Sequence, residues 1–345
     1  MRSEMYRRTI GLFLSICAVA WLSGCPPGPN GEKDNGPTLK WSEAFDAEEL
    51  GWLLSVNGRS ADRVYAVGGG QYDGAATRYD GEAWNTLSLP DSVPLLTWVW
   101  CFEDGRPILA GNEGTIVWRK NGGWAVDDTP TEQNLWGVWG ASRDDVWAVG
   151  GNGNPKDGKP TVIRYDGSKW SNVTVPDLKH DGVHALFKVW GTASDNVYMV
   201  GQNGTILHWN GSKLVDETPD TDKDLISLWG TGEDNILVVG GRGNGVLARW
   251  DGESWSTHSL APLLGMNGIW VRDRKHAWIT GARGTIAHVD PTADTIEPTV
   301  ERVDTRRDFH AIFGLAGDGL FAVGGNLNMP SGPFHGIAYR GRETE

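Results

Sequence analysis

The densest run of potential metal ligands is Asp220-Thr221-Asp222-Lys223-Asp224, in which carboxylates alternate with other residues. Calcium-binding loops begin with this spacing, because Ca²⁺ is held by oxygen ligands. The run then departs from such a loop. Leu225 stands where a glycine has to turn the chain, and Thr231 stands where a bidentate glutamate has to close the site. We therefore predict no bound metal and interpret the run as a solvated acidic rim.

Acidic side chains gather in two segments that each follow a short extended run. These candidate partner-binding residues are Asp127, Asp128 and Glu132 in the first segment, and Asp216, Glu217, Asp220, Asp222 and Asp224 in the second. Surface carboxylates attract basic groups on a partner, and salt screens the attraction. The two segments therefore predict a protein-binding surface whose affinity falls as salt rises.

Cationic or titratable residues recur at one repeated position, namely Arg78, Arg164, His208, Arg249 and His288. They could line a site for an anion. A repeated arginine that faces the carboxylates of turns is more often one half of a structural ion pair. The pattern favours the ion pairs and leaves the anion site open.

The residue types needed for catalysis do not fall into a known pattern. The sequence has no GxSxG elbow, HExxH pair, glycine-rich phosphate loop or repeated SxDxGxTW box. His180 and His184 lie in a glycine-interrupted loop, which makes them a weak metal pair. Cys101 occupies a position where other copies of the repeat have glycine, so we predict a buried and unreactive thiol. No catalytic residue and no cofactor is expected.

A 13-residue frame returns seven times without insertion or deletion, and its best copy is VWGASRDDVWAVG at 138–150. The copies start at Val56, Val99, Val138, Val189, Leu228, Ile269 and Ile312. Successive starts are 43, 39, 51, 39, 41 and 43 residues apart, which suits one four-stranded propeller blade. The sequence therefore predicts an all-β fold, a seven-bladed β-propeller over residues 41–345.

The seventh copy ends after Ile337-Ala338-Tyr339 without an outer strand. The segment 39–45 can supply it, because Trp41 matches the tryptophans that open the outer strands of other copies, such as Trp84 and Trp170. A strand contributed by the N-terminus closes the ring and leaves no open edge. In the first turn of five of the seven copies, aspartates such as Asp62 are expected to bond backbone amides. Between the third and fourth strands, Asp-Gly pairs such as Asp80-Gly81 favour type I′ hairpins.

Loop lengths distinguish the two faces of the predicted ring. First-to-second strand turns keep one length, whereas second-to-third loops range from two residues to the long segments 151–160 and 325–335. These loops and the acidic segments belong to one face, which we call the loop face, and binding residues are usually carried on such loops. Four further candidates for partner binding lie in the long loops: Lys156, Asp157, Asn326 and Asn328.

Residues 1–24 combine Arg2, Arg7 and Arg8 with an apolar run that is short for a membrane span, as in a signal peptide. Leu22-Ser23-Gly24-Cys25 resembles the lipobox of bacterial lipoproteins, which implies that Cys25 is lipidated and that 25–40 is a flexible tether. Removal of the signal leaves 28 basic and 43 acidic side chains, a net charge of −15. This charge disfavours nucleic acid as a partner.

The segment VYAVGGGQYDGAATRYDGEAWNTLSLP at 64–90 resembles kelch repeats, with a diglycine and the pair Tyr79 and Trp84. The frame is closer to tryptophan-rich propellers of bacterial envelope proteins. The resemblance implies a propeller and carries over no kelch function.

We therefore expect a monomeric, non-catalytic lipoprotein that binds an envelope protein and is anchored by lipid to the bacterial outer membrane, on its periplasmic or surface side. A glycan- or peptidoglycan-binding propeller with exposed tryptophans is the first alternative. A propeller hydrolase or lyase with carboxylates converging at the channel mouth is the second.

Overall fold

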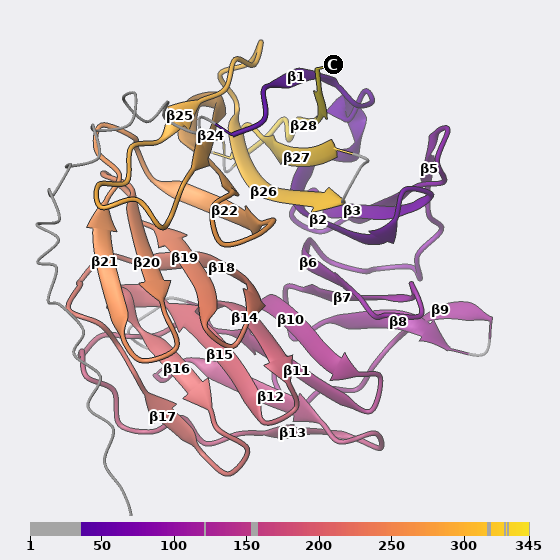
Figure 1. Ribbon diagram of the computed structural model, residues 1–345. Coiled ribbons are helices and arrows are strands. Elements are labelled where there is room, and N and C mark those ends of the chain that lie inside the picture. Colours follow the sequence, from indigo (N-terminus) through magenta and orange to yellow (C-terminus); the bar gives the residue numbers. More distant parts are fainter. Residues whose placement is uncertain are drawn as a thin grey trace, which may run out of the picture. The chain divides into compact units, whose positions relative to one another are not determined.

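The computed structural model describes residues 36–120, 122–152, 158–315, 319–327, 329 and 331–344. Within the compact unit 35–345 the chain forms seven four-stranded antiparallel sheets (Figure 1). Helical structure in the described part is limited to the 3-10 turns η1 (Glu48–Leu50), η3 (Gln202–Gly204) and η4 (Ala282–Gly284). The predicted all-β, seven-bladed propeller is confirmed.

Each of the first six blades is made of four consecutive strands. Blades one and two are β2 (Trp52–Ser60), β3 (Arg63–Gly69), β4 (Gly74–Tyr79) and β5 (Trp84–Thr86), then β6 (Leu96–Cys101), β7 (Pro107–Gly111), β8 (Ile116–Lys120) and β9 (Gly123–Val126). Blades three and four are β10 (Leu135–Ser142), β11 (Asp145–Gly150), β12 (Thr161–Tyr165) and β13 (Trp170–Asn172), then β14 (Leu186–Ala193), β15 (Asn196–Gly201), β16 (Ile206–Trp209) and β17 (Leu214–Asp216). Blades five and six are β18 (Leu225–Gly232), β19 (Asn235–Gly240), β20 (Val246–Trp250) and β21 (Trp255–Ser259), then β22 (Met266–Val271), β23 (Ala277–Gly281), β24 (Thr285–Val289) and β25 (Thr299–Val300).

The seventh blade joins the two ends of the described chain. Its strands are β26 (Asp308–Leu315), β27 (Gly319–Gly325), β28 (Gly336–Glu343) and, as the outer strand, β1 (Leu39–Glu43). β1 therefore begins inside the segment predicted as tether. Trp41 pairs with Gly341 just as Trp84 pairs with Tyr79 in blade one. A Cβ on Gly341 would lie 2.8 Å from the Trp41 ring, so glycine leaves room for this tryptophan.

The innermost strands of successive blades contact one another around the ring, and β26 of blade seven contacts β2 of blade one (Figure 1). Between the sheets lie the frame residues that face away from the axis. Trp147 and Trp278 are the largest fully buried side chains. A buried aromatic side chain removes roughly 150–250 Å² from water. The tryptophans thus fill the spaces between diverging blades, as their repeated positions predicted.

The Asp-Gly turns between third and fourth strands differ from the predicted type I′ geometry. Only the glycine has positive φ, as at Gly81 (102°) and Gly167 (91°). Asp80 instead closes a four-residue turn, since its Oδ1 accepts the amides of Glu82 and Ala83 at 3.0 and 2.9 Å. The Asp side chain therefore holds these turns through the backbone amides that follow it, and the turns are not of type I′.

Two aspartates of the first turns also make contacts that the sequence did not predict. Asp62 Oδ1 accepts the Ser60 hydroxyl, and Asp144 donates its own amide to Ser142 Oγ. Their Cβ atoms lie against the glycines of the Asp-Gly turns, where a Cβ on Gly167 would be 3.1 Å from that of Asp144. First and third turns of a blade therefore lie together on one face, as predicted.

The short second-to-third loops are held by the chain that links each blade to the next. Their central residues Glu113, Asn203 and Arg283 adopt positive φ of 53–57°. The amide of each donates to a side chain at the start of the following blade or just before it, for example Asn203 N–H to Asp224 Oδ1 at 3.0 Å. The links and these loops consequently form the second face, the loop face.

Cys101 is fully buried, and burial raises its pKa above the ordinary value for a thiol. This agrees with a packing role. No helix among the described residues is long and apolar enough to cross a membrane.

The pairing of β1 with β28 predicts a sharp difference between two truncations. Deleting 26–46 removes β1 and is expected to lower the melting temperature strongly, because blade seven then exposes an unpaired edge. Deleting 26–38 keeps β1 and is expected to change the melting temperature little. Thermal unfolding followed by circular dichroism checks this, and equal losses in the two variants would contradict closure by β1.

Candidate functional site

A β-bulge interrupts the inner strand of every blade at the same place. In blade three, for example, the register shifts between Leu135 and Gly137. The residues at the seven shifts are Leu54, Thr97, Trp136, Phe187, Ile226, Asn267 and His310. A bulge re-aims the side chain of its extra residue. Here the bulges form a ring of side chains at the loop-face end of the axial channel.

A cavity of about 520 Å³ opens at this channel mouth, and five of the bulge residues line it. Its remaining lining comes from Lys188, from Gly241, Arg242, Gly265, Ala282 and Asp308 on the loop face, and from Leu327 in the long loop of blade seven. The cavity is therefore built by several blades at once. Propeller closure is what brings these residues, far apart in sequence, together.

Lys188 is the most unusual residue of the cavity. Its side chain is buried (3% exposed), and its Nζ donates to the Trp136 carbonyl at 2.9 Å. The ammonium lies 4.1 Å from the centroid of the Trp98 ring, a cation–π contact. No carboxylate of the described residues forms an ion pair with it. Burial accordingly lowers the Lys188 pKa from 10.5 to about 7.

His310 stands near Lys188 in the same cavity. Its Nδ1 lies 2.6 Å from the Leu54 carbonyl, so this nitrogen carries the proton and Nε2 is left as an acceptor. Burial and the neighbouring Lys188 ammonium lower the pKa of His310 well below its ordinary value. The imidazole is consequently neutral, and Lys188 is the group of this pair that carries charge near neutral pH.

Aromatic rings close the channel below the cavity. The Trp229 ring of blade five lies 6.2 Å from Trp100 in blade two and 6.0 Å from Phe313 in blade seven. Trp100 also packs 6.1 Å from Trp139. Rings from widely separated blades thus meet at the axis, and the cavity is a pocket open toward the loop face.

Two exposed apolar side chains stand on neighbouring loops of the same face. Tyr72 in the β3–β4 loop is 70% exposed, and Met329 in the β27–β28 loop is 47% exposed. The two loops contact each other, since a Cβ on Gly70 would lie 3.3 Å from the Phe334 ring. We call Tyr72 and Met329 the apolar rim. Large exposed apolar side chains that gather on one face are typical of interaction surfaces.

The predicted acidic residues divide into two groups. Asp127, Asp216, Glu217 and Asp224 are partly buried and hold the fold: Asp127 accepts Trp170 Nε1 at 3.1 Å, and Asp216 accepts the Lys179 amide at 2.6 Å. Glu217 contacts His208, and Asp224 also pairs with Arg242. By contrast, Asp128, Glu132, Asp220 and Asp222 are exposed. Only this second group is free to meet a partner without disturbing the links.

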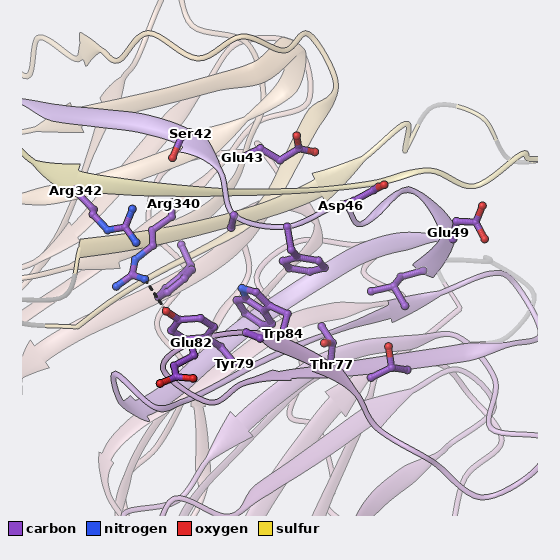
Figure 2. A pocket seen from close by; sticks show the side chains of 16 residues that line it. Ser42, Glu43, Asp46, Glu49, Thr77, Tyr79, Glu82, Trp84, Arg340 and Arg342 are labelled. Carbon is purple, nitrogen blue, oxygen red and sulfur yellow. Dashed lines mark hydrogen bonds between the residues drawn. The ribbon is translucent and has the colours of Figure 1, made fainter.

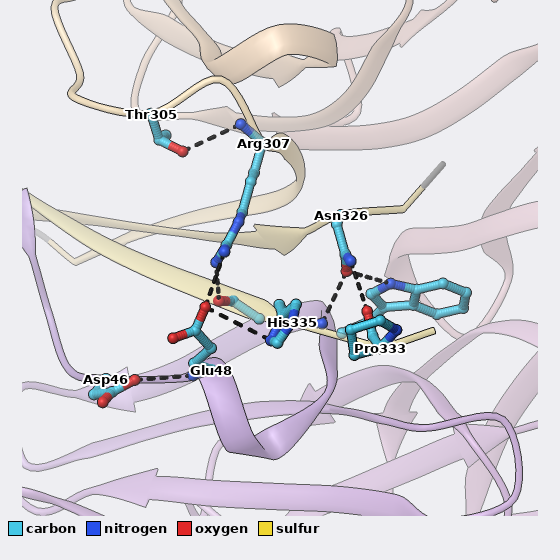
Figure 3. Close-up of polar contacts among 9 residues, drawn as sticks. Asp46, Glu48, Thr305, Arg307, Asn326, Pro333 and His335 are labelled. Carbon is cyan, nitrogen blue, oxygen red and sulfur yellow. Dashed lines mark hydrogen bonds and ion pairs between the residues drawn. The ribbon is translucent and has the colours of Figure 1, made fainter. Parts of the chain in front are cut away.

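Asn326 has a structural role that the sequence did not reveal. Its Oδ1 accepts Trp52 Nε1 at 3.0 Å and the His335 amide at 2.8 Å, and its Nδ2 donates to Pro333 (Figure 3). Nearby, Glu48 pairs with Arg307 at 2.9 Å. These contacts hold the ends of the long loop against blade one. Lys156, Asp157 and Asn328 lie outside the described residues.

The repeated third-strand cations do not converge on a common site. Arg164 forms the predicted type of ion pair, with Asp145 at 2.7 Å. Arg78 and Arg249 donate to the carbonyls of Asp62 and Pro291, and His288 contacts His276. Each cation is thus held by groups near its own blade, which disfavours a shared anion site at these positions.

Two other cavities are less suited to ligand binding. One, of about 530 Å³, lies where β1 meets blade one; there Arg340 donates to the Tyr79 hydroxyl at 3.1 Å, and Glu43 and Glu49 lie around it (Figure 2). Another lies on the face that carries the first and third turns, and it is lined by Arg63, Arg78, Arg106 and Arg119. Arg106 pairs with Asp104, and the other three arginines donate to backbone carbonyls. The guanidinium groups named at the two cavities donate to protein groups, and none of the charged residues named here is buried as Lys188 is.

Within the described part of the chain, no group of three or more His, Cys, Asp or Glu side chains is arranged to hold a metal ion. None of the tryptophans described by the structure is fully exposed. Glycan recognition was predicted to need exposed tryptophans, so the burial of the described tryptophans disfavours it.

The fold is similar to that of YCF48 bound to D1 peptide, with a TM-score of 0.64 and 15% sequence identity over 90% of this chain and 99% of that chain. It is also similar to YCF48 from Cyanidioschyzon merolae, with a TM-score of 0.61 and 14% identity over 87% of this chain and 98% of that chain. At these identities the likeness shows the propeller fold alone.

No family model matches the chain. The immune protein Tsi7 of Pseudomonas aeruginosa is 32% identical over 87 residues, 24% of this chain, and the match spans only 26% of Tsi7. A UPF0060 membrane protein of Paraburkholderia xenovorans is 28% identical over 106 residues, 30% of this chain and 82% of that protein. These matches leave the family of the chain open.

Sequence reasoning missed Lys188, although the repeat carried a signal. The position before each frame start holds Ser55, Trp98, Gly137, Lys188, Ser227, Gly268 and Ala311. Five of these seven residues are small, as expected where inner strands crowd around an axis. A lysine at this repeated position does not suit close packing of the inner strands. Trp98, its cation–π partner, is the other large residue at the position.

Replacing Lys188 with Met is expected to change how stability depends on pH. The unfolded pKa of 10.5 lies above the folded value of about 7, so between these pH values the unfolded state binds more protons. Wild-type stability should therefore rise by about 1.4 kcal/mol per pH unit from this group, a slope that Lys188→Met loses. The variant should be the more stable protein near pH 7.

Urea unfolding at pH 7, 8 and 9 measures this slope. Lys223→Met serves as control, because Lys223 is half exposed and sits on the same face. Parallel profiles for wild type and Lys188→Met would contradict a buried, unpaired ammonium.

Proposed function

We propose that this chain is a non-catalytic, monomeric lipoprotein that binds a protein partner of the bacterial envelope through its loop face. The observation that carries the proposal is the channel-mouth cavity, which holds the buried cation Lys188 and opens on the face that also carries the exposed apolar rim. Such a combination of pocket, charge and exposed apolar groups suits recognition of a protruding segment of another protein.

Protein recognition has more support than the alternatives. The similar propeller YCF48 has been solved with D1 peptide bound, so this architecture accommodates a peptide. Glycan binding required exposed tryptophans, and those described are buried or half-buried. A hydrolase or lyase required convergent carboxylates. Asp308 is the carboxylate among the described lining residues, and it accepts the Arg283 amide at 2.7 Å.

The proposed location rests on the lipobox-like segment that ends at Cys25. Pro26 follows this cysteine in place of the aspartate that retains typical lipoproteins in the inner membrane. Outer-membrane anchoring is therefore the proposed destination.

Replacing both Tyr72 and Met329 with Ser is expected to reduce partner capture at least tenfold while leaving thermal stability nearly unchanged, because both side chains are exposed. The measurement is crosslinking in the native envelope, followed by quantitative mass spectrometry of the captured protein.

Val126→Ser with Val300→Ser is the matched control, since these residues are 50% and 56% exposed on outer strands away from the channel mouth. If the control lost capture and the rim variant kept it, the binding face would be the outer edge of the blades.

Replacing Cys25 with Ser is expected to release the protein from membranes, since the lipid is its proposed anchor. Fractionation of cells by ultracentrifugation, with immunoblotting of both fractions, checks this. A Cys25→Ser protein that stays in the membrane fraction would contradict lipid anchoring.

A further inference from the structure

We infer that the channel-mouth cavity binds a carboxylate group, which forms an ion pair with the ammonium of Lys188. The inference rests on the proposed function in taking the loop face as the binding face. It goes further by naming the chemical group that is recognised there and the residue that recognises it.

The hydrogen-bonding capacity of Lys188 supports an anionic ligand. An ammonium has three N–H donors. One donates to the Trp136 carbonyl, and the Trp98 ring lies close to the same nitrogen. The cavity adjoins the remaining surface of the side chain. A buried charge without a counter-ion is costly, and an anion entering the cavity would remove that cost by pairing with it.

The other charged groups of the cavity favour a single negative charge over a phosphate. Arg242 already pairs with Asp224 at 2.6 Å, and His310 is neutral with Nε2 as an acceptor. The Asp308 carboxylate would repel a second negative charge. One cation is therefore offered to the ligand, which matches a carboxylate.

The lining of the cavity also indicates what the carboxylate is attached to. Trp136, Phe187, Ile226 and Leu327 contribute rings and aliphatic groups around the path from the loop face to Lys188. Such walls suit an apolar stem that carries the carboxylate at its end. Two sources offer this chemistry, a free short-chain acid and the C-terminal carboxylate of a polypeptide.

The first test measures binding of butyrate to the full chain by isothermal titration calorimetry at pH 6.5. We expect saturable binding of butyrate and at least tenfold weaker binding of butyramide, which has the same shape without the charge. Lys188→Met should lose butyrate binding at least tenfold, whereas the control Lys223→Met should keep it. Equal binding of butyrate by wild type and Lys188→Met would overturn the inference.

The pH profile of the wild-type protein gives a second readout that needs no variant. Affinity should be flat below about pH 7 and fall about tenfold per pH unit well above it, because the amine must take up a proton before it can pair. His310 stays neutral over this range. An affinity that does not change between pH 6 and pH 9 would overturn the ion pair.

Two peptides distinguish the sources of the carboxylate. A hexaalanine with a free C-terminus and the same peptide with an amidated C-terminus are titrated separately. Binding of the free-ended peptide alone assigns the site to a chain end, and binding of butyrate with neither peptide assigns it to small acids. If neither butyrate nor the free-ended peptide bound, the inference would fail.

Failure of this inference can be told apart from failure of the proposed function. Loss of partner capture on replacing Tyr72 and Met329, without any carboxylate binding, would leave the loop face as the protein-binding face and remove only the carboxylate. Carboxylate binding with undiminished partner capture by the rim variant would keep the carboxylate site and remove the apolar rim as the protein-binding surface.

Discussion

The pairing of β1 with β28 is the contact on which the rest of the molecule depends. A blade of three strands would present a free edge. With Trp41 packed on Gly341, blade seven has four strands like its neighbours. The contact of β26 with β2 then closes the ring between two complete blades.

The bulges give this ring the layer of side chains that forms the proposed binding site. A regular inner strand would direct alternate side chains at the axis and between the blades, leaving no position for a separate layer at the mouth. One extra residue per strand supplies that layer, and hydrogen bonds across blades fix it, such as His310 to Leu54 and Asn267 to Phe309. The cavity is consequently part of the rigid scaffold, while the apolar rim is carried by two loops of the same face.

The sequence predicts the blades well because their signals are local. The frame and the turn glycines of each copy lie within a few dozen residues, and the strand shared by the two ends is indicated by the match of Trp41 to the tryptophans of other outer strands. The site is harder to foresee because its contacts are not local. From the sequence, Asp224 is interpreted as a surface acid, but in the fold it accepts the Asn203 amide. Asn326 is likewise interpreted as a loop residue, but its side chain accepts Trp52 Nε1 from a distant part of the chain. The bulges also cannot be recognised from the sequence, because every copy of the repeat has one and the copies therefore do not differ in length there.

Lys188 occupies an inner-strand position where the fold itself does not require a charged side chain. Five of the other six blades have serine, glycine or alanine at the same position, so the channel does not require a long side chain there. A buried ammonium without a counter-ion lowers the stability of the folded state, and the Trp98 ring offsets only part of that loss. A ligand that pairs with the ammonium stabilises the ring by RT ln(1 + [L]/Kd), where [L] is the ligand concentration. The residue that weakens the empty propeller is therefore the one that couples its stability to occupancy of the channel mouth.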